Sequence, residues 1–226
     1  MGQASFPPLK IMHASGNLYV YTSYGRYQDQ LFPANAMYAV TDKGIVLFDT
    51  PWDSVYFQPL LDSLDRRYHK PVIMCFSTHW HEDRTAGLNY YARKGIETFA
   101  TRRTDSLCIL HHKPRARKLI SEDTVFRVGR TTFHVFYGGP GHSFDNIVVW
   151  FPERKLLYGG CLIKSSAAKD LGNLDDAFPG RWTSTIECIQ HEFGPPSITV
   201  AGHGPWQDNR SIPHTLSLLA AYNKKR

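Results

Sequence analysis

The stretch STHWHEDRTAGL, residues 77–88, directly follows the apolar run VIMCF, residues 72–76. It places His79, His81 and Asp83 at alternate positions. In an extended segment, residues two apart point to the same side, so we expect two imidazoles and a carboxylate to converge where a buried strand ends. Zinc accepts both ligand types at about 2.0–2.2 Å. The stretch therefore predicts a metal site at the end of a strand.

Further candidate ligands follow other strand-like runs, each beside glycine. They are His142, Cys161 and His203. Glycine permits close approach of the backbone, and the carboxyl ends of strands are where open α/β sheets bind ligands. The six residues divide into two sets, His79, His81 and His142, and Asp83, Cys161 and His203. Three protein ligands for each metal leave a position open for water, which is typical of a catalytic site.

The remaining histidines lack this setting, and we expect no ligand role for them: His13, His69, His111, His112, His134, His191 and His214. Any one of the six candidates taken alone would fit a surface or hydrogen-bonding residue equally well. Their combination at four strand ends is what favours a metal site.

Strand-like runs rich in Val, Ile, Phe and Tyr cover residues 18–24, 36–40, 44–48, 72–76, 96–100, 125–128, 132–137, 147–151, 156–158 and 198–201. Helix-like runs cover residues 54–68, 84–94, 103–111, 183–193 and 213–225. Early strands form hairpins and later strands alternate with helices, which predicts an α/β layered protein with sheets inside and helices outside. A soft boundary near residues 114–121 separates two loosely similar halves.

The bulk properties limit the possible classes. The 226 residues, 42% of them hydrophobic, suffice for one sizeable core. No apolar run approaches the ~20 residues of a membrane helix. The net charge is +6, but the basic residues are scattered and lack interleaved aromatics, so we expect a solvated surface and no nucleic-acid partner. The amino-terminal residues do not resemble a secretory signal, so either a signal has been removed or the protein is cytoplasmic.

The four cysteines form no CxxC pair, which argues against a zinc knuckle or a thioredoxin-type site. Cys75 lies in a strand-like run, and Cys108 and Cys188 lie in helix-like runs. We expect these three to be buried small hydrophobes.

Six motifs in the chain resemble the metallo-β-lactamase superfamily and, within it, the class B β-lactamases of the first subclass. They are DTPW (49–52), HWHEDR (79–84), GHSFDN (141–146), GCLIKS (160–165), GNL (172–174) and GHG (202–204). Their order and spacing match the family over essentially the whole chain. The resemblance implies a four-layer αββα sandwich, a single domain over residues 1–226 with similar halves of about 1–117 and 118–226, and a metal site at one edge of the sheets.

Two positions separate branches of this superfamily. Arg84 stands where glyoxalase-II-like and nuclease members have another metal-binding histidine, and Cys161 stands where they use a bridging aspartate. Both favour the lactamase branch. His79, in place of the asparagine of the monozinc subclass, favours an enzyme with two Zn²⁺ ions.

The resemblance implies a zinc-dependent β-lactamase. A zinc-bound hydroxide would hydrolyse the amide of penicillins, cephalosporins and carbapenems without a covalent enzyme intermediate. Asp83 would bind the second zinc and orient the attacking water, Asn173 would stabilise the oxyanion, and Lys164 would bind the substrate carboxylate. Asp49 and Arg84 would orient the ligands.

The resemblance also implies a mobile flap at residues 24–33, with Tyr27 and Phe32 as substrate contacts, and a pocket lined by Trp80. We expect a monomer in the periplasm, with a small-molecule β-lactam as its partner, no membrane span, and a role in antibiotic resistance as a carbapenemase.

Two other functions stay open. The chain could be another metal-dependent hydrolase of the superfamily, acting on thioesters, lactones or phosphodiesters, or a non-catalytic zinc-binding protein. Residues 175–178 read DDAF where family members more often have GDAN, which could reposition Asn173 or reduce affinity for anionic substrates. Residues 166–169 match the SxxK pattern of serine β-lactamases, but the companion K-T-G is absent, so we reject a serine mechanism.

Overall fold

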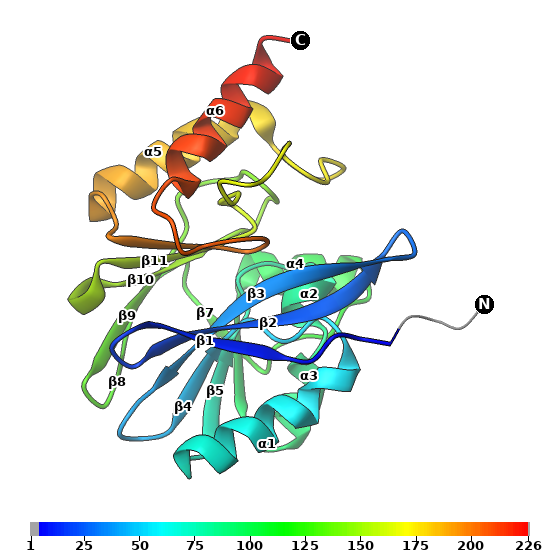
Figure 1. Cartoon of the computed structure of the whole chain (residues 1–226), viewed down its shortest axis with the longest axis vertical. Coiled ribbons are helices and arrows are strands. Elements are labelled where there is room, and N and C mark those ends of the chain that lie inside the picture. Colours follow the sequence, from blue (N-terminus) through cyan, green and yellow to red (C-terminus); the bar gives the residue numbers. More distant parts are fainter. Residues whose placement is uncertain (1–4, 226) are drawn as a thin grey trace.

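The computed structural model describes residues 5–225, which form two facing β-sheets flanked by helices (Figure 1). The larger sheet has seven strands in sequential order: β1 (Lys10–Ser15), β2 (Leu18–Tyr27), β3 (Gln30–Val40), β4 (Ile45–Phe48), β5 (Val72–Phe76), β6 (Glu97–Thr101) and β7 (Lys118–Ile120). Strands β1 to β4 pair antiparallel, and β4 to β7 pair parallel.

The smaller sheet has five strands in the order β12-β11-β10-β9-β8. They are β8 (Asp123–Val128), β9 (Thr131–Phe136), β10 (Val148–Phe151), β11 (Leu156–Gly160) and β12 (Ile198–Ala201). Only the β11–β12 pair is parallel. The α-helices of the described residues are α1 (Phe57–Tyr68), α2 (Glu82–Thr85), α3 (Leu88–Arg93), α4 (Arg102–Leu110), α5 (Pro179–Phe193) and α6 (Ser211–Asn223), and short 3-10 turns cover Ser54–Tyr56 and Pro152–Arg154.

Alternation along the buried strands produces the layers. Successive side chains of a strand point to opposite faces, so a strand covered on both sides is apolar throughout. In β4, Val46 and Phe48 pack into the core between the sheets, whereas Ile45 and Leu47 pack toward α1 and α3. In β10, alternate residues likewise face the other sheet or the pair α5 and α6. The resulting four-layer αββα sandwich confirms the predicted fold class.

Several local predictions differ from the structure. The expected helix at 84–94 is broken into α2 and α3 around Gly87, whose N–H donates to Thr50 Oγ1 at 3.0 Å. Strands β1 and β7 were not expected. Cys188 is exposed, so its predicted burial is wrong: it lies on the solvent side of α5, opposite the apolar face that packs on the sheet. Among residues 5–225, no helix combines the length and apolar character needed to span a bilayer.

Strands β2 and β3 extend further than the sequence indicated, and their pairing continues to Tyr27 and Gln30. The two residues between them, Gln28 and Asp29, both have positive φ, as in a two-residue hairpin turn. The expected flap is therefore a two-stranded ribbon that projects from the sheet.

Candidate metal centre

The six candidate ligands meet at the edge shared by the two sheets. His79 and His81 lie in the loop after β5, and Asp83 lies in α2. The other three follow strands of the second half: His142 after β9, Cys161 after β11 and His203 after β12. The extended geometry expected for residues 79–83 is wrong, because the chain bends after β5 and enters α2 at Glu82. The turn sends Asp83 to a different cluster from the two histidines before it.

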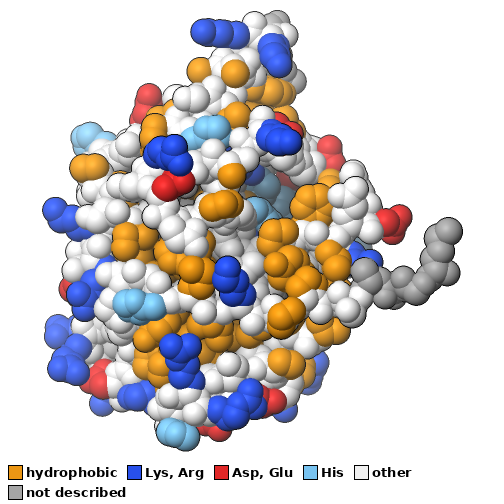
Figure 2. All heavy atoms as spheres, in the orientation of Figure 1, with side chains coloured by type: hydrophobic (Ala, Val, Ile, Leu, Met, Phe, Trp, Pro, Cys, Tyr) orange, Lys and Arg blue, Asp and Glu red, His pale blue; other side chains and the backbone are white. Residues whose placement is uncertain are grey.

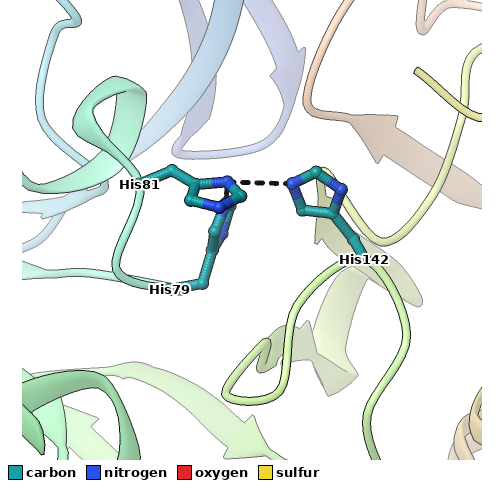
Figure 3. A group of neighbouring side chains, drawn as sticks. All are labelled: His79, His81 and His142. Atoms are coloured by element: carbon teal, nitrogen blue, oxygen red, sulfur yellow. Dashed lines mark hydrogen bonds between the residues drawn. The ribbon is translucent and has the colours of Figure 1, made fainter. Parts of the chain in front are cut away.

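Three imidazoles form the first cluster, and their rings point toward one another (Figure 3). His81 Nδ1 lies 3.1 Å from His79 Nε2 and 3.1 Å from His142 Nε2. Nitrogens bound to a tetrahedral zinc at about 2.0–2.1 Å would lie about 3.3 Å apart. The observed spacing therefore fits a single ion between the rings.

Burial keeps two of these rings neutral. It lowers the pKa of His79 and of His142 well below the ordinary value, and neighbouring His81 lowers that of His79 further. Neutral imidazole is the form that binds a metal. His142 Nδ1 is buried without a hydrogen-bond partner among the described residues. His142 is therefore neutral and directs Nε2 toward the other two histidines, as a metal ligand would. Among the described residues, none holds its Nδ1 by a hydrogen bond.

Asp83, Cys161 and His203 form the second cluster. Cys161 Sγ lies 3.5 Å from Asp83 Oδ2 and 3.2 Å from His203 Nε2, and the last two atoms are 3.2 Å apart. His203 Nδ1 donates to the carbonyl of Pro33 at 2.7 Å, which turns its Nε2 toward the other two donors. Burial opposes a charge on His203, but Cys161 and Asp83 raise its pKa above the ordinary value. The second cluster, through Cys161 and Asp83, therefore stabilises a positive charge among its donor atoms.

The two clusters are neighbours. His79, Asp83 and Cys161 also present donor atoms within 4.8 Å of one another, so His79 borders both sets. The two sets of donors are therefore contiguous.

Arg84 supports the second cluster from beneath and is fully buried. Its Nη2 lies 2.8 Å from Asp83 Oδ2 and donates to Cys161 Sγ at 3.0 Å. Burial works against ionisation of Asp83, but Arg84 outweighs it and holds the pKa of that carboxyl well below its ordinary value. Arg84 thus points inward and keeps Asp83 an anion.

Asp49 lies under the first cluster. Its carboxylate accepts hydrogen bonds from Thr78 N at 2.7 Å, Thr78 Oγ1 at 2.9 Å and Tyr158 OH at 2.5 Å. Thr78 Oγ1 in turn lies 3.3 Å from His79 Nδ1. Asp49 could therefore orient His79 only indirectly, because Thr78 lies between them.

The clusters lie in a cleft of about 1130 Å³, and Figure 2 shows histidine side chains inside a hollow between hydrophobic residues. Tyr27 and Phe32, both 41% exposed, line the cleft from the flap, and Trp80 lines it beside the first cluster. Lys164 and Asn173 line the same cleft. All the predicted site residues that should touch substrate therefore face one cavity.

Lys164 and Asn173 are held in different ways. Lys164 Nζ lies 5.1 Å from the centre of the Trp182 ring, and burial lowers its pKa. Asn173 is exposed, and its side-chain oxygen accepts a hydrogen bond from Asp175 N at 3.1 Å. That bond leaves the Asn173 amide nitrogen to donate elsewhere. Asp175 thus orients Asn173 in this chain.

Two residues at the site escaped the sequence reasoning. Asp176 Oδ2 lies 3.0 Å from His81 Nε2 and accepts a hydrogen bond from Trp80 Nε1 at 3.0 Å. His111, expected to have no role, stacks on Trp80. Burial would raise the pKa of Asp176, but the hydrogen bonds from His81 and Trp80 lower it below its ordinary value. Local sequence held no signal for either contact, because each joins segments far apart in the chain.

The serine of the SxxK pattern is engaged by another residue. Ser166 donates its hydroxyl to Asp208 Oδ2. Lys169 is exposed.

Comparison with known proteins agrees with this geometry. The family model described as "Metallo-beta-lactamase superfamily" matches residues 29–203. The chain belongs to the metallo-β-lactamase superfamily. It is 43% identical over 220 residues to a metallo-beta-lactamase type 2 of Elizabethkingia meningoseptica, a match that covers 97% of this chain and 88% of the relative. It is 38% identical to metallo-beta-lactamase IND-1 of Chryseobacterium indologenes, with the same coverage.

Solved metallo-β-lactamase structures have the same fold. The crystal structure of metallo-beta-lactamase IND-7 superposes with a TM-score of 0.90 at 37% identity, covering 94% of this chain and 98% of that one. A metallo-beta-lactamase from Pontibacter korlensis also gives 0.90, at 34% identity, with 94% of this chain and 99% of that one covered. The protein is therefore a metal-dependent hydrolase of this superfamily, whose metal is generally zinc. The nitrogen, sulfur and carboxylate donors of both clusters suit zinc.

Proposed function

We propose that this protein is a zinc-dependent β-lactamase that hydrolyses penicillins, cephalosporins and carbapenems. The observation that carries the proposal is the pair of adjacent three-donor clusters in one cleft that also presents Lys164. The relatives named metallo-beta-lactamase support the same substrate class.

The two clusters would hold two Zn²⁺ ions. His79, His81 and His142 would bind one, and Asp83, Cys161 and His203 the other. Bound zinc supplies a Lewis acid and brings the pKa of a coordinated water to about 7. Because Arg84 keeps Asp83 ionised, the Asp83 carboxylate can accept a hydrogen bond from the attacking water and orient it.

Lys164 would bind the carboxylate that β-lactams carry next to the ring nitrogen. Its ammonium lies over the Trp182 ring in a half-buried position, where water competes less for a charge-assisted hydrogen bond. Asn173 would donate its amide N–H to the lactam carbonyl oxygen as that oxygen gains charge. Tyr27, Phe32 and Trp80 would pack on the apolar parts of the substrate. Hydrolysis would proceed without a covalent enzyme intermediate.

Hydrolysis of a chromogenic cephalosporin tests the proposal. Purified protein should turn over the substrate, lose activity to a chelator and regain it with added zinc. Cys161→Ser should lower zinc content toward one ion and reduce the rate, whereas Cys188→Ser, which alters an exposed cysteine far from the clusters, should match the wild type. Absence of turnover in protein shown to hold zinc would refute the β-lactamase and point to another hydrolase or a non-catalytic zinc protein.

We also propose that the chain acts as a single-domain monomer in the periplasm and confers carbapenem resistance. One hydrophobic core joins the two sheets, which supports a single domain. Sedimentation at equilibrium would test the monomer. Fractionation of cells and the carbapenem concentration that inhibits their growth would test the location and the resistance.

A further inference from the structure

One carboxylate oxygen joins His81 to the residue before it. Asp176 Oδ2 lies 3.0 Å from His81 Nε2 and 3.0 Å from Trp80 Nε1. A carboxylate accepts, so His81 must carry its proton on Nε2 and present the lone pair of Nδ1 to the three-histidine cluster. The position of this oxygen therefore fixes the direction of one ligand.

Trp80 is itself held from the other side. Its ring stacks on that of His111 with centres 4.0 Å apart and planes 16° from parallel. His111 directly follows the last residue of α4, and its N–H donates to Leu107 O at 2.9 Å. The next segment is fastened to α2 by the ion pair between Lys113 and Glu82. The stack thus connects the loop of the metal cluster to the end of a helix.

We propose that Trp80 and His111 are positioning residues for the metal: His111 fixes the indole, the indole N–H fixes Asp176, and Asp176 fixes His81. This inference rests on the proposed metal centre. It assigns Trp80 a task beyond lining the cleft, because the one polar atom of its side chain bonds Asp176 and one face of its ring stacks on His111.

The alternative is that Trp80 contributes only bulk. Phenylalanine retains an aromatic face that can stack on His111 but has no N–H, so Trp80→Phe separates the two roles. Loss of an outer partner of a metal-binding histidine commonly weakens metal affinity by 10- to 100-fold. We therefore expect Trp80→Phe to weaken binding at the three-histidine cluster by roughly tenfold.

The experiment titrates metal-free full-length protein with Co²⁺ in competition with a chelating dye. Thiolate-to-cobalt absorption reports occupancy of the Cys161 cluster, and the visible d–d bands report the three-histidine cluster in addition. Trp52→Phe is the matched control, because Trp52 lines the same cleft next to His203 and not His81. His111→Asn and its exposed neighbour His112→Asn form a second pair.

The expected result is weaker binding at the three-histidine cluster in Trp80→Phe and His111→Asn, with unchanged thiolate absorption and wild-type behaviour of both controls. Equal affinity in wild type and Trp80→Phe would overturn this inference while leaving the metal centre intact. Failure of the wild type to bind cobalt or zinc would instead refute the proposed function. If circular dichroism shows that Trp80→Phe is unfolded, the comparison of His111→Asn with His112→Asn replaces it. Equal cobalt affinity of these two variants at the three-histidine cluster would then overturn the inference.

Discussion

Asp145 is a buried carboxylate that the proposed chemistry does not use, and it should make stability depend on pH. The residue is fully buried. One oxygen accepts from Ser143 Oγ at 2.8 Å, and the other has no partner among the described residues. Burial raises the pKa of Asp145 from 3.8 to about 6, against the nearby hydroxyls of Thr104 and Ser143, which lower it. At about 1.4 kcal/mol for each pKa unit, the rise corresponds to about 3 kcal/mol.

The direction of the pH effect follows from proton counts. Between the two pKa values the folded protein keeps the proton that the unfolded chain has released, so stability falls as pH rises. The destabilisation caused by ionised Asp145 is absent well below pH 3.8 and complete above about pH 6. Asp145→Asn removes it. The variant should therefore gain stability relative to wild type as pH rises, by about 1.4 kcal/mol between about pH 5 and pH 7.5.

Urea unfolding of both metal-free proteins across this range measures the effect. The buried histidines also titrate, but they do so in both proteins, and the difference between the two free energies of unfolding removes their contribution. Asp123→Asn, which alters an exposed carboxylate on β8, should follow the wild type. A wild-type-to-Asp145→Asn difference that stays flat with pH, or that grows as pH falls, would refute the reasoning.

Three further predictions concern the site and its flap. Arg84→Met should destabilise the protein by about 3–5 kcal/mol in urea unfolding, because it leaves buried carboxylates without their cation; a loss below about 1 kcal/mol would contradict this. In Gly25→Leu, the new Cβ would lie 2.2 Å from Trp52 Cδ2 and push the flap away from Trp52. The variant should lose about 1–3 kcal/mol of unfolding free energy, and its KM should change more than its kcat. Unchanged steady-state kinetics would show that the flap tolerates the side chain. Replacing Gln28 and Asp29 by Asn-Gly should raise Tm, because both positions have positive φ, which Gln disfavours and which Asn and Gly adopt most readily. An unchanged or lower Tm would argue against strain in this turn.

Sequence reasoning worked where local geometry decides the outcome. Continuous apolar runs such as Ile45–Phe48 predict a strand covered on both faces, and β4 is buried throughout. His142, Cys161 and His203 each follow a strand beside glycine, and that common setting sufficed to predict that they would meet. Strand ends at one edge of a sheet are brought together by topology, so no knowledge of particular contacts was needed.

The same reasoning failed where contacts cross the chain. Asp176 approaches His81 across 95 positions, and nothing in the DDAF segment indicates which acid will turn inward. The short strand β7 reads as a basic linker because only its pairing with β6 makes it a strand. Cys188 lies in α5, and the way α5 packs on the sheet determines which of its side chains are buried. The residue type alone does not show that Cys188 faces solvent.

The origin of the six donors bears on stability as well as on catalysis. Three follow β5 of the seven-stranded sheet, two follow β11 and β12 of the other sheet, and His142 follows β9. Arg84, from the first sheet's side, reaches both Cys161 and the carbonyl of Gly202. Because neither half alone supplies a complete cluster, a metal bound at either one also joins the two sheets. Metal affinity and the packing of the sheets are then linked, since a ligand that binds only the folded state stabilises it by mass action.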